Sequence, residues 1–147
     1  MKSLSVRVGV ILIGVAIFGY AEVWAEDWKL FSLGSDSTFW WYDSQGITYH
    51  PNKVIRVSVK IVKAEEIVEM VKSGTKFKLP ELEKMTSERE YARDLLEIDC
   101  LGNTVNHIQK LHYDSKGVLK SGEVEHSPGI SIAPKSVAET LYKIVCK

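Results

Sequence analysis

The sequence predicts an α+β domain, an antiparallel sheet of about six strands with a C-terminal helix packed on one face and tethered by a disulfide bond. Residues 53–63, KVIRVSVKIVK, alternate apolar and polar side chains, which is typical of a strand with one buried face. Residues 131–147, SIAPKSVAETLYKIVCK, space apolar side chains as an amphipathic helix does. The chain has two cysteines, Cys100 and Cys146, and the second ends that helix.

The N-terminus has the pattern of an export signal. Lys2 and Arg7 precede an uncharged run, residues 8–21. Its length of about 14 residues fits a signal-peptide core and falls short of the roughly 20 residues that span a bilayer. Small side chains favour cleavage after Ala25, with Ala21 as second choice. The alternative is an uncleaved membrane anchor.

We therefore expect a signal peptide over residues 1–25 and a single domain over residues 26–147, which has no membrane span and lies in the periplasm, on the cell surface or outside the cell. The 19 basic residues balance the 19 acidic ones. A near-neutral surface gives no general attraction to nucleic acid, so we expect no nucleic-acid partner.

The two cysteines are expected to pair, because thiols in an oxidising compartment form disulfides. A bridge between Cys100 and Cys146 would stabilise the fold by roughly 4 kcal/mol on the chain-entropy model. The alternative is two free thiols, one of them catalytic. Nothing beside either cysteine supplies the base or the lowered pKa that a nucleophilic thiol needs.

The first half of the domain predicts three strands and one helix. Aromatic and β-branched residues favour strands over residues 27–34 and 37–46, with a turn between them. In the strand over residues 53–63, four apolar side chains share one face, Ile55, Val57, Val59 and Ile61. Residues 64–72 change to helical spacing and stop at Ser73-Gly74. Residues 75–90 are charged without a firm period, and we expect a loop with a weak helical turn.

The second half predicts three more strands and the closing helix. Leu96, Ile98 and Cys100 share a face of a strand over residues 90–102. Residues 103–114 and 118–125 form a hairpin around the turn DSKG. We expect a loop over residues 126–129.

The closing helix has two start signals. Pro134 fits a first helical turn, whereas Ser136 and Glu139 match a capping box that would start the helix slightly later. Its apolar stripe consists of Val137, Leu141, Ile144 and Val145.

Four histidines, His50, His107, His112 and His126, invite a metal site. On one strand His107 and His112 are an odd number of positions apart and point to opposite faces unless a bulge intervenes. None has the spacing of a zinc site. We expect surface or half-buried histidines, no metal and no cofactor.

A catalytic carboxylate pair is the main enzymatic alternative. Glu97 and Asp99 share a strand face, and a hydrolase would use them with His107. Strands with an acidic solvent face are common, so we expect no catalytic residues. We expect Asp43 and Asp114 to lie in turns, with side chains that form hydrogen bonds to the nearby backbone.

The aromatic run FWWY, residues 39–42, is the unusual cluster of the chain. Alternation sends Trp40 and Tyr42 to one face and Phe39 and Trp41 to the other. We expect one pair in the core. The other pair is either a second buried face or an exposed contact patch.

The chain resembles the surface-adhesin E family of small exported bacterial proteins over nearly all of residues 26–147. The resemblance rests on Trp28, the stretches WYDSQGI, VSVKIV and YDSKG, the segment EYARDLLEIDC, and the ending IAPKSVAETLYKIVC. Its most specific elements are the E-x-D-C of Glu97, Asp99 and Cys100 and that ending. The lipid-anchor cysteine of the family is missing, and residues 75–90 match nothing in it.

The resemblance implies an antiparallel sheet with a C-terminal helix held by the Cys100–Cys146 disulfide. It also implies a non-enzymatic adhesin that binds matrix proteins and plasminogen and can dimerise. We thus expect an exported binding module with a protein ligand, from the matrix or the cell envelope, and a homodimer as one assembly. The alternative is a periplasmic structural or inhibitory accessory protein. The sequence does not locate the binding surface.

Overall fold

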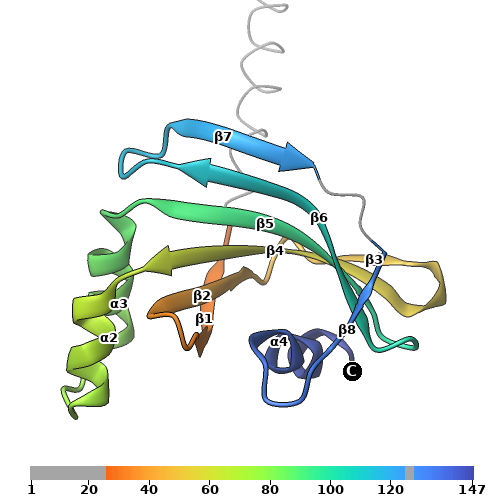
Figure 1. Cartoon of the computed structure of the whole chain (residues 1–147), viewed down its shortest axis with the longest axis horizontal. Coiled ribbons are helices and arrows are strands. Elements are labelled where there is room, and N and C mark those ends of the chain that lie inside the picture. Colours follow the sequence, from red (N-terminus) through yellow and green to blue (C-terminus); the bar gives the residue numbers. More distant parts are fainter. Residues whose placement is uncertain (1–25, 125–127) are drawn as a thin grey trace, which may run out of the picture.

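The computed structural model describes residues 26–124 and 128–147, which form one antiparallel sheet with three α-helices (Figure 1). The expected signal peptide and His126 lie outside the described residues. The strands are β1 (Trp28–Leu33), β2 (Thr38–Asp43), β3 (Thr48–His50), β4 (Val54–Lys63), β5 (Tyr91–Asp99), β6 (Thr104–Tyr113), β7 (Leu119–Val124) and β8 (Ile130–Ser131). The helices are α2 (Glu65–Lys72), α3 (Leu79–Ser87) and α4 (Val137–Val145), with a 3₁₀ turn, η1, over Pro51–Lys53.

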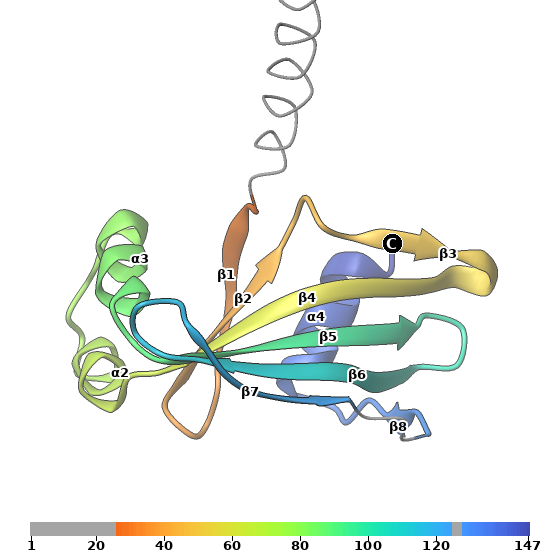
Figure 2. The ribbon, with the colours of Figure 1, turned by 90° about the horizontal axis from the view of Figure 1, so that it is seen from above.

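The strands follow the order β1-β2-β4-β5-β6-β7, and each pairs antiparallel with its neighbours. The short β3 pairs with β4 beyond the end of β2, and the short β8 pairs with β6 beyond the end of β7. Figure 2 shows the long strands β4, β5 and β6 side by side over α4. The predicted α+β class and the C-terminal helix are confirmed.

The sheet has eight strands in the described ranges, so the expectation of about six was too low. The two strands that the sequence did not reveal, β3 and β8, have three and two residues. Such short segments are too brief to show an alternation of apolar and polar side chains. They are strands because longer neighbours offer them hydrogen bonds.

The first core lies between the sheet and α4. β4 contributes Ile55, Val57 and Val59 on one face, as its alternation predicts. Buried side chains of the adjoining strands and of α4 complete this core, namely Leu96, Ile98, Val105, Ile132, Leu141 and Val145. Removing this apolar surface from water is the main force that holds α4 on the sheet.

A second core lies on the opposite face, at the end of the sheet where Figure 1 shows α2 and α3. Phe39 and Trp41 are buried there beside Val62, and α2 covers them with Ile67 and Val68. The other half of the aromatic run, Trp40 and Tyr42, is half-buried against the first core. The aromatic run therefore supplies both cores, because β2 is covered on each face.

Residues 75–90 contain a complete helix, α3, and the expectation of a loop was wrong there. The carboxylate of Glu81 accepts a hydrogen bond from the backbone N–H of Lys78 (3.1 Å) at the start of the helix. Leu82 and Met85 pack against the second core. These apolar residues are too few to predict a helix from sequence. Packing against the sheet stabilises α3, whose intrinsic helix propensity alone is not sufficient.

The closing helix begins at the later of its two start signals. The Ser136 hydroxyl caps α4 by accepting a hydrogen bond from the backbone N–H of Glu139 (3.1 Å). Pro134 precedes the helix instead of lying in its first turn, because Lys135 has a φ of 60°, which interrupts helical geometry. None of the helices in the described part of the chain is long and apolar enough to cross a membrane.

Candidate functional site

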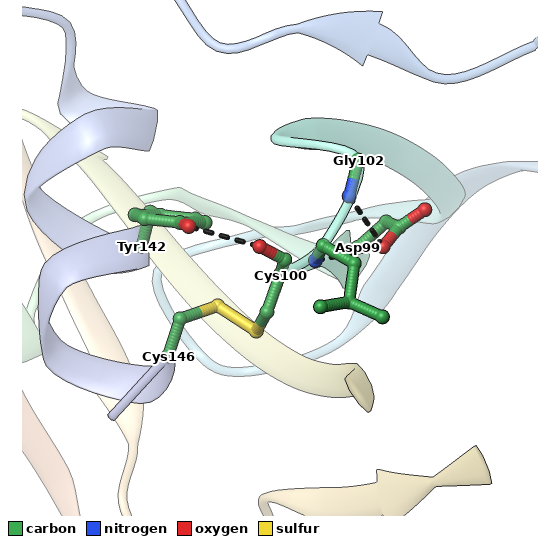
Figure 3. The surroundings of a disulfide bond; sticks show 6 residues. Asp99, Cys100, Gly102, Tyr142 and Cys146 are labelled. Atoms are coloured by element: carbon green, nitrogen blue, oxygen red, sulfur yellow. Dashed lines mark hydrogen bonds between the residues drawn. A yellow bond between two sulfur atoms is a disulfide. The ribbon is translucent and has the colours of Figure 1, made fainter. Parts of the chain in front are cut away.

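The end of α4 is fastened to the sheet by a covalent and a polar link (Figure 3). Cys100 and Cys146 form the predicted disulfide, with their Cα atoms 5.6 Å apart. One helical turn earlier, the Tyr142 hydroxyl donates a hydrogen bond to the Cys100 carbonyl (2.9 Å). The backbone N–H of Cys100 donates to the carbonyl of Lys53 (3.1 Å), so the segment after β5 is also fixed to η1, which directly precedes β4.

A cavity of about 280 Å³ opens beside this disulfide, and we call it the clasp pocket. Tyr49 and Leu101, which are 75% and 70% exposed, stand at its mouth. The ionisable side chains on its rim, tyrosines aside, are all basic. The lining consists of Tyr49, His50, Lys53, Val54, Ile55, Cys100, Leu101, Tyr142, Val145, Cys146 and Lys147.

The three residues of the hydrolase alternative do not converge. Glu97 accepts a hydrogen bond from the guanidinium of Arg56 (Nε–Oε2, 2.9 Å) on one face of the sheet. His107 lies on the other face, because its partner across the strands is Leu96. The carboxylate of Asp99 accepts from the backbone N–H groups that follow it and thereby shapes the turn after β5.

A bulge in β6 brings two of the predicted histidines to one face. Leu95 pairs with Gln109 and Leu96 pairs with His107, so Ile108 is an extra residue between them. The alternation shifts by one position there, and His112 lies on the same face as His107. The sequence predicts opposite faces for the two imidazoles unless a bulge intervenes, and the structure has that bulge.

A buried carboxyl group, that of Asp94, lies on the same face of the sheet and contacts His107. Asp94 is 1% exposed, its Oδ2 is 3.4 Å from the Nδ1 of His107, and its Oδ1 has no hydrogen-bond partner. Burial raises the pKa of this carboxyl group above its usual range, against the opposing charges of Lys110, His107 and His112. Sequence reasoning missed Asp94, because alternation places it where an apolar residue is expected.

The remaining predicted polar residues have structural roles. The Asp114 carboxylate accepts from the backbone N–H groups of Lys116 and Val118 (2.9 Å each), and these bonds lower its pKa. Asp43 caps its own turn in the same way, as predicted. His50 shares a hydrogen bond with Thr48 (3.1 Å). Within residues 26–124 and 128–147, no group of three or more His, Cys, Asp or Glu side chains is placed to hold a metal ion.

On the face opposite α4, the ammonium group of Lys60 lies among aromatic rings. Its Nζ is 5.3 Å from the ring centroid of Trp28, 5.9 Å from that of Trp41 and 5.7 Å from that of Tyr91. Burial lowers the pKa of Lys60, because the charged form loses hydration. The rings restore part of that loss through cation–π attraction.

The outer edge of the sheet carries exposed apolar side chains. All six residues of β7 are exposed, and no described strand pairs with the outer side of β7. Four apolar residues on this edge are more than half exposed, and we call them the outer-edge residues: Val118, Leu119, Val124 and Ile130. The strand prediction located β7, but its edge position follows only from the sheet order.

The comparisons with known proteins give no match. No family model, no curated protein and no solved structure matches this chain.

Proposed function

We propose that this protein is an exported, non-enzymatic binding module that docks a protein ligand along the outer edge of its sheet. The observation that carries the proposal is the exposure of Leu119 and Val124, two apolar side chains of β7 that lie on the same face of the sheet. A single exposed apolar residue is ordinary on a protein surface. Leu119 and Val124 lie on one face of an edge strand, which suits them to a contact surface.

An edge strand has one row of backbone N–H and C=O groups without a partner strand. Natural edges are usually protected by charged residues, proline or a covering loop. β7 contains Lys120 and Glu123, but Leu119 and Val124 near its two ends are apolar and exposed. Such an edge can receive an extended segment of another protein by strand addition, in which backbone hydrogen bonds provide affinity and the exposed side chains contribute specificity.

The resemblance to the surface-adhesin E family supports the same class of function. It points to a matrix protein, plasminogen or an envelope protein as ligand, and to a homodimer as one assembly. The balanced charge of the chain gives no reason to expect nucleic acid. A periplasmic accessory protein remains the second candidate, since it would use the same edge for another ligand. A hydrolase has less support, because Glu97 and His107 lie on opposite faces of the sheet.

The proposal is tested by placing charges on the outer edge. The double variant Leu119→Lys/Val124→Lys should lose at least tenfold in binding to immobilised plasminogen, matrix proteins or a protein captured from envelope extract. The matched control is Met70→Lys/Leu79→Lys, which puts the same charges on exposed apolar sites of α2 and α3. Surface plasmon resonance measures all three proteins. Equal binding by parent and edge variant, or no binding by the parent, would overturn the proposal.

The adhesin and the accessory protein differ in location. Protease treatment of intact cells should degrade an adhesin, whereas a periplasmic protein survives until the outer membrane is opened. Immunoblotting of treated and untreated cells gives the result. Survival of the protein in intact cells would favour the accessory role.

A further inference from the structure

We propose that the clasp pocket binds a small amphiphile, a medium-chain fatty acid, with its chain in the cavity and its carboxylate at the rim. This site is separate from the outer edge. It lies beside the start of β4, where β5 leads to Cys100, whereas β7 pairs with residues 109–113 of β6, toward the other end. Ile130 pairs with Val105 of β6, which β5 separates from β4.

The wall of the clasp pocket is suited to an apolar chain. Ile55 and Val145 of the first core line the pocket together with the disulfide. Tyr49 and Leu101 expose most of their apolar surface to water at the mouth. A ligand that covers these side chains gains the free energy of removing apolar surface from water.

Polar groups beside the disulfide are already engaged within the protein. The Tyr142 hydroxyl donates to the Cys100 carbonyl, and the Cys100 N–H donates to the Lys53 carbonyl. A polar ligand body placed against them would lose its hydrogen bonds to water without replacing them. This part of the wall favours an apolar ligand body.

The rim selects the charge of the head group. His50, Lys53 and Lys147 are basic, and no acidic side chain lines the pocket. The carboxylate of Asp99, close in sequence, is turned to the backbone N–H groups of Leu101 and Gly102. The rim is complementary to an anion, and a carboxylate can accept hydrogen bonds from the ammonium groups.

The backbone at the rim is held in a rarely populated conformation. Asn52 and Lys53 have φ values of 62° and 56°, in the left-handed region that non-glycine residues seldom adopt. This places Lys53 at the mouth of the pocket while its carbonyl fixes Cys100. A lysine held in this conformation beside a cavity is a pattern found at binding sites.

The size of the cavity limits the ligand. A volume of about 280 Å³ is at the lower end of ligand pockets, which selects a single chain of medium length. Each additional methylene group that enters the pocket should tighten binding about fourfold. Affinity should stop rising once the chain fills the cavity.

Calorimetric titration of the purified protein with four probes tests the proposal. Decanoate should bind at one site per chain, and decanol, which lacks the charge, at least tenfold more weakly. Decyltrimethylammonium carries the opposite charge and should bind more weakly still. Acetate should give no saturable binding. Equal affinity for decanoate and decanol, or for decanoate and acetate, would overturn the proposal.

Variants locate the site. Lys53→Asn removes a rim charge and suits the left-handed backbone, since asparagine tolerates it. Lys147→Gln removes another charge after the end of α4, where it cannot disturb an element. Each should weaken decanoate several-fold and leave decanol unchanged, whereas Leu101→Ser should weaken both probes. The control Lys72→Asn, in α2, should change neither. If Lys53→Asn and Lys147→Gln both bind decanoate with the affinity of the parent, the proposed site is refuted.

The fatty-acid site and the protein-binding edge can fail independently. The edge variant Leu119→Lys/Val124→Lys should bind decanoate with the affinity of the parent. A loss of decanoate binding in that variant would contradict the assignment of the ligand to the clasp pocket.

Discussion

The Tyr142 hydroxyl donates a 2.9 Å hydrogen bond to the carbonyl of Cys100, the residue whose sulfur is bonded to Cys146. Two side chains of the last helical turns thus hold one residue at the end of β5. The hydrogen bond orients the helix, and the disulfide keeps its end from separating (Figure 3). Both links border the clasp pocket.

Removing the Tyr142 hydroxyl separates the contribution of this hydrogen bond to stability from that of the disulfide. Tyr142→Phe should lower the free energy of unfolding by about 1 kcal/mol, because the Cys100 carbonyl loses its donor while the ring still packs. Urea unfolding measures the change. Tyr49→Phe is the control, since the side chain is largely exposed and should change stability by less than about 0.5 kcal/mol. A larger loss in the control would contradict the assigned role of Tyr142.

Removing the disulfide should cost more. Cys146→Ser should lower the free energy of unfolding by about 2–5 kcal/mol, because the unfolded chain regains the freedom that the cross-link removes. Calorimetric melting of parent and variant gives the difference. Adding a reductant to the parent should reproduce the effect. A variant that melts at the parent's temperature would contradict a stabilising bridge.

Export and oxidation can be read from one mass spectrum. We expect the intact mass of the exported protein, measured without reductant, to lack residues 1–25 and two hydrogens. The mass after reduction should rise by two hydrogens. A full-length mass would instead indicate the uncleaved anchor.

The second core predicts a cost for truncating Phe39. Phe39→Ala should lower the free energy of unfolding by about 3–5 kcal/mol, because a fully buried ring leaves a cavity between β2 and α2. A contact patch on the surface would give a change of less than about 0.5 kcal/mol. Urea unfolding distinguishes the two outcomes.

Asp94 predicts an unusual dependence of stability on pH. Burial raises its pKa, so the folded protein holds the proton more tightly than the unfolded chain. The free energy of unfolding should therefore fall as the pH rises from about 3.9, the ordinary value, through the raised pKa. Asp94→Asn removes this loss. Urea unfolding should show that the free energy of unfolding of the variant minus that of the parent is larger at neutral pH than at acid pH.

Asp114 supplies a control of opposite sign. Hydrogen bonds from Val118 and Lys116 lower its pKa, so its contribution is present above the ordinary aspartate pKa and is lost as the pH falls through the lowered one. Relative to the parent, Asp114→Asn should be less stable at neutral pH, and the difference should shrink toward acid. The same trend in both variants would contradict the roles assigned to these carboxyl groups.

Local pattern was sufficient where one face of an element is buried throughout. The alternation of Ile55, Val57 and Val59 predicted β4, and Ser136 was one of the two start signals that the sequence offered for α4. The pairing of Cys100 with Cys146 followed from their number and the expected compartment. Burial of one face and helix capping depend on the spacing of residues along the chain, so these features can be predicted from the sequence.

Other features depend on neighbours that are distant in sequence. The bulge at Ile108 turns His107 and His112 to the face of Asp94, and only pairing with β5 reveals the extra residue. α3 forms because the second core accepts its short apolar stripe. The outer edge and the clasp pocket likewise follow from strand order and helix placement. Elements with regular spacing of apolar residues can thus be predicted from the chain alone. Which surfaces stay exposed follows from the packing of segments that are distant in sequence.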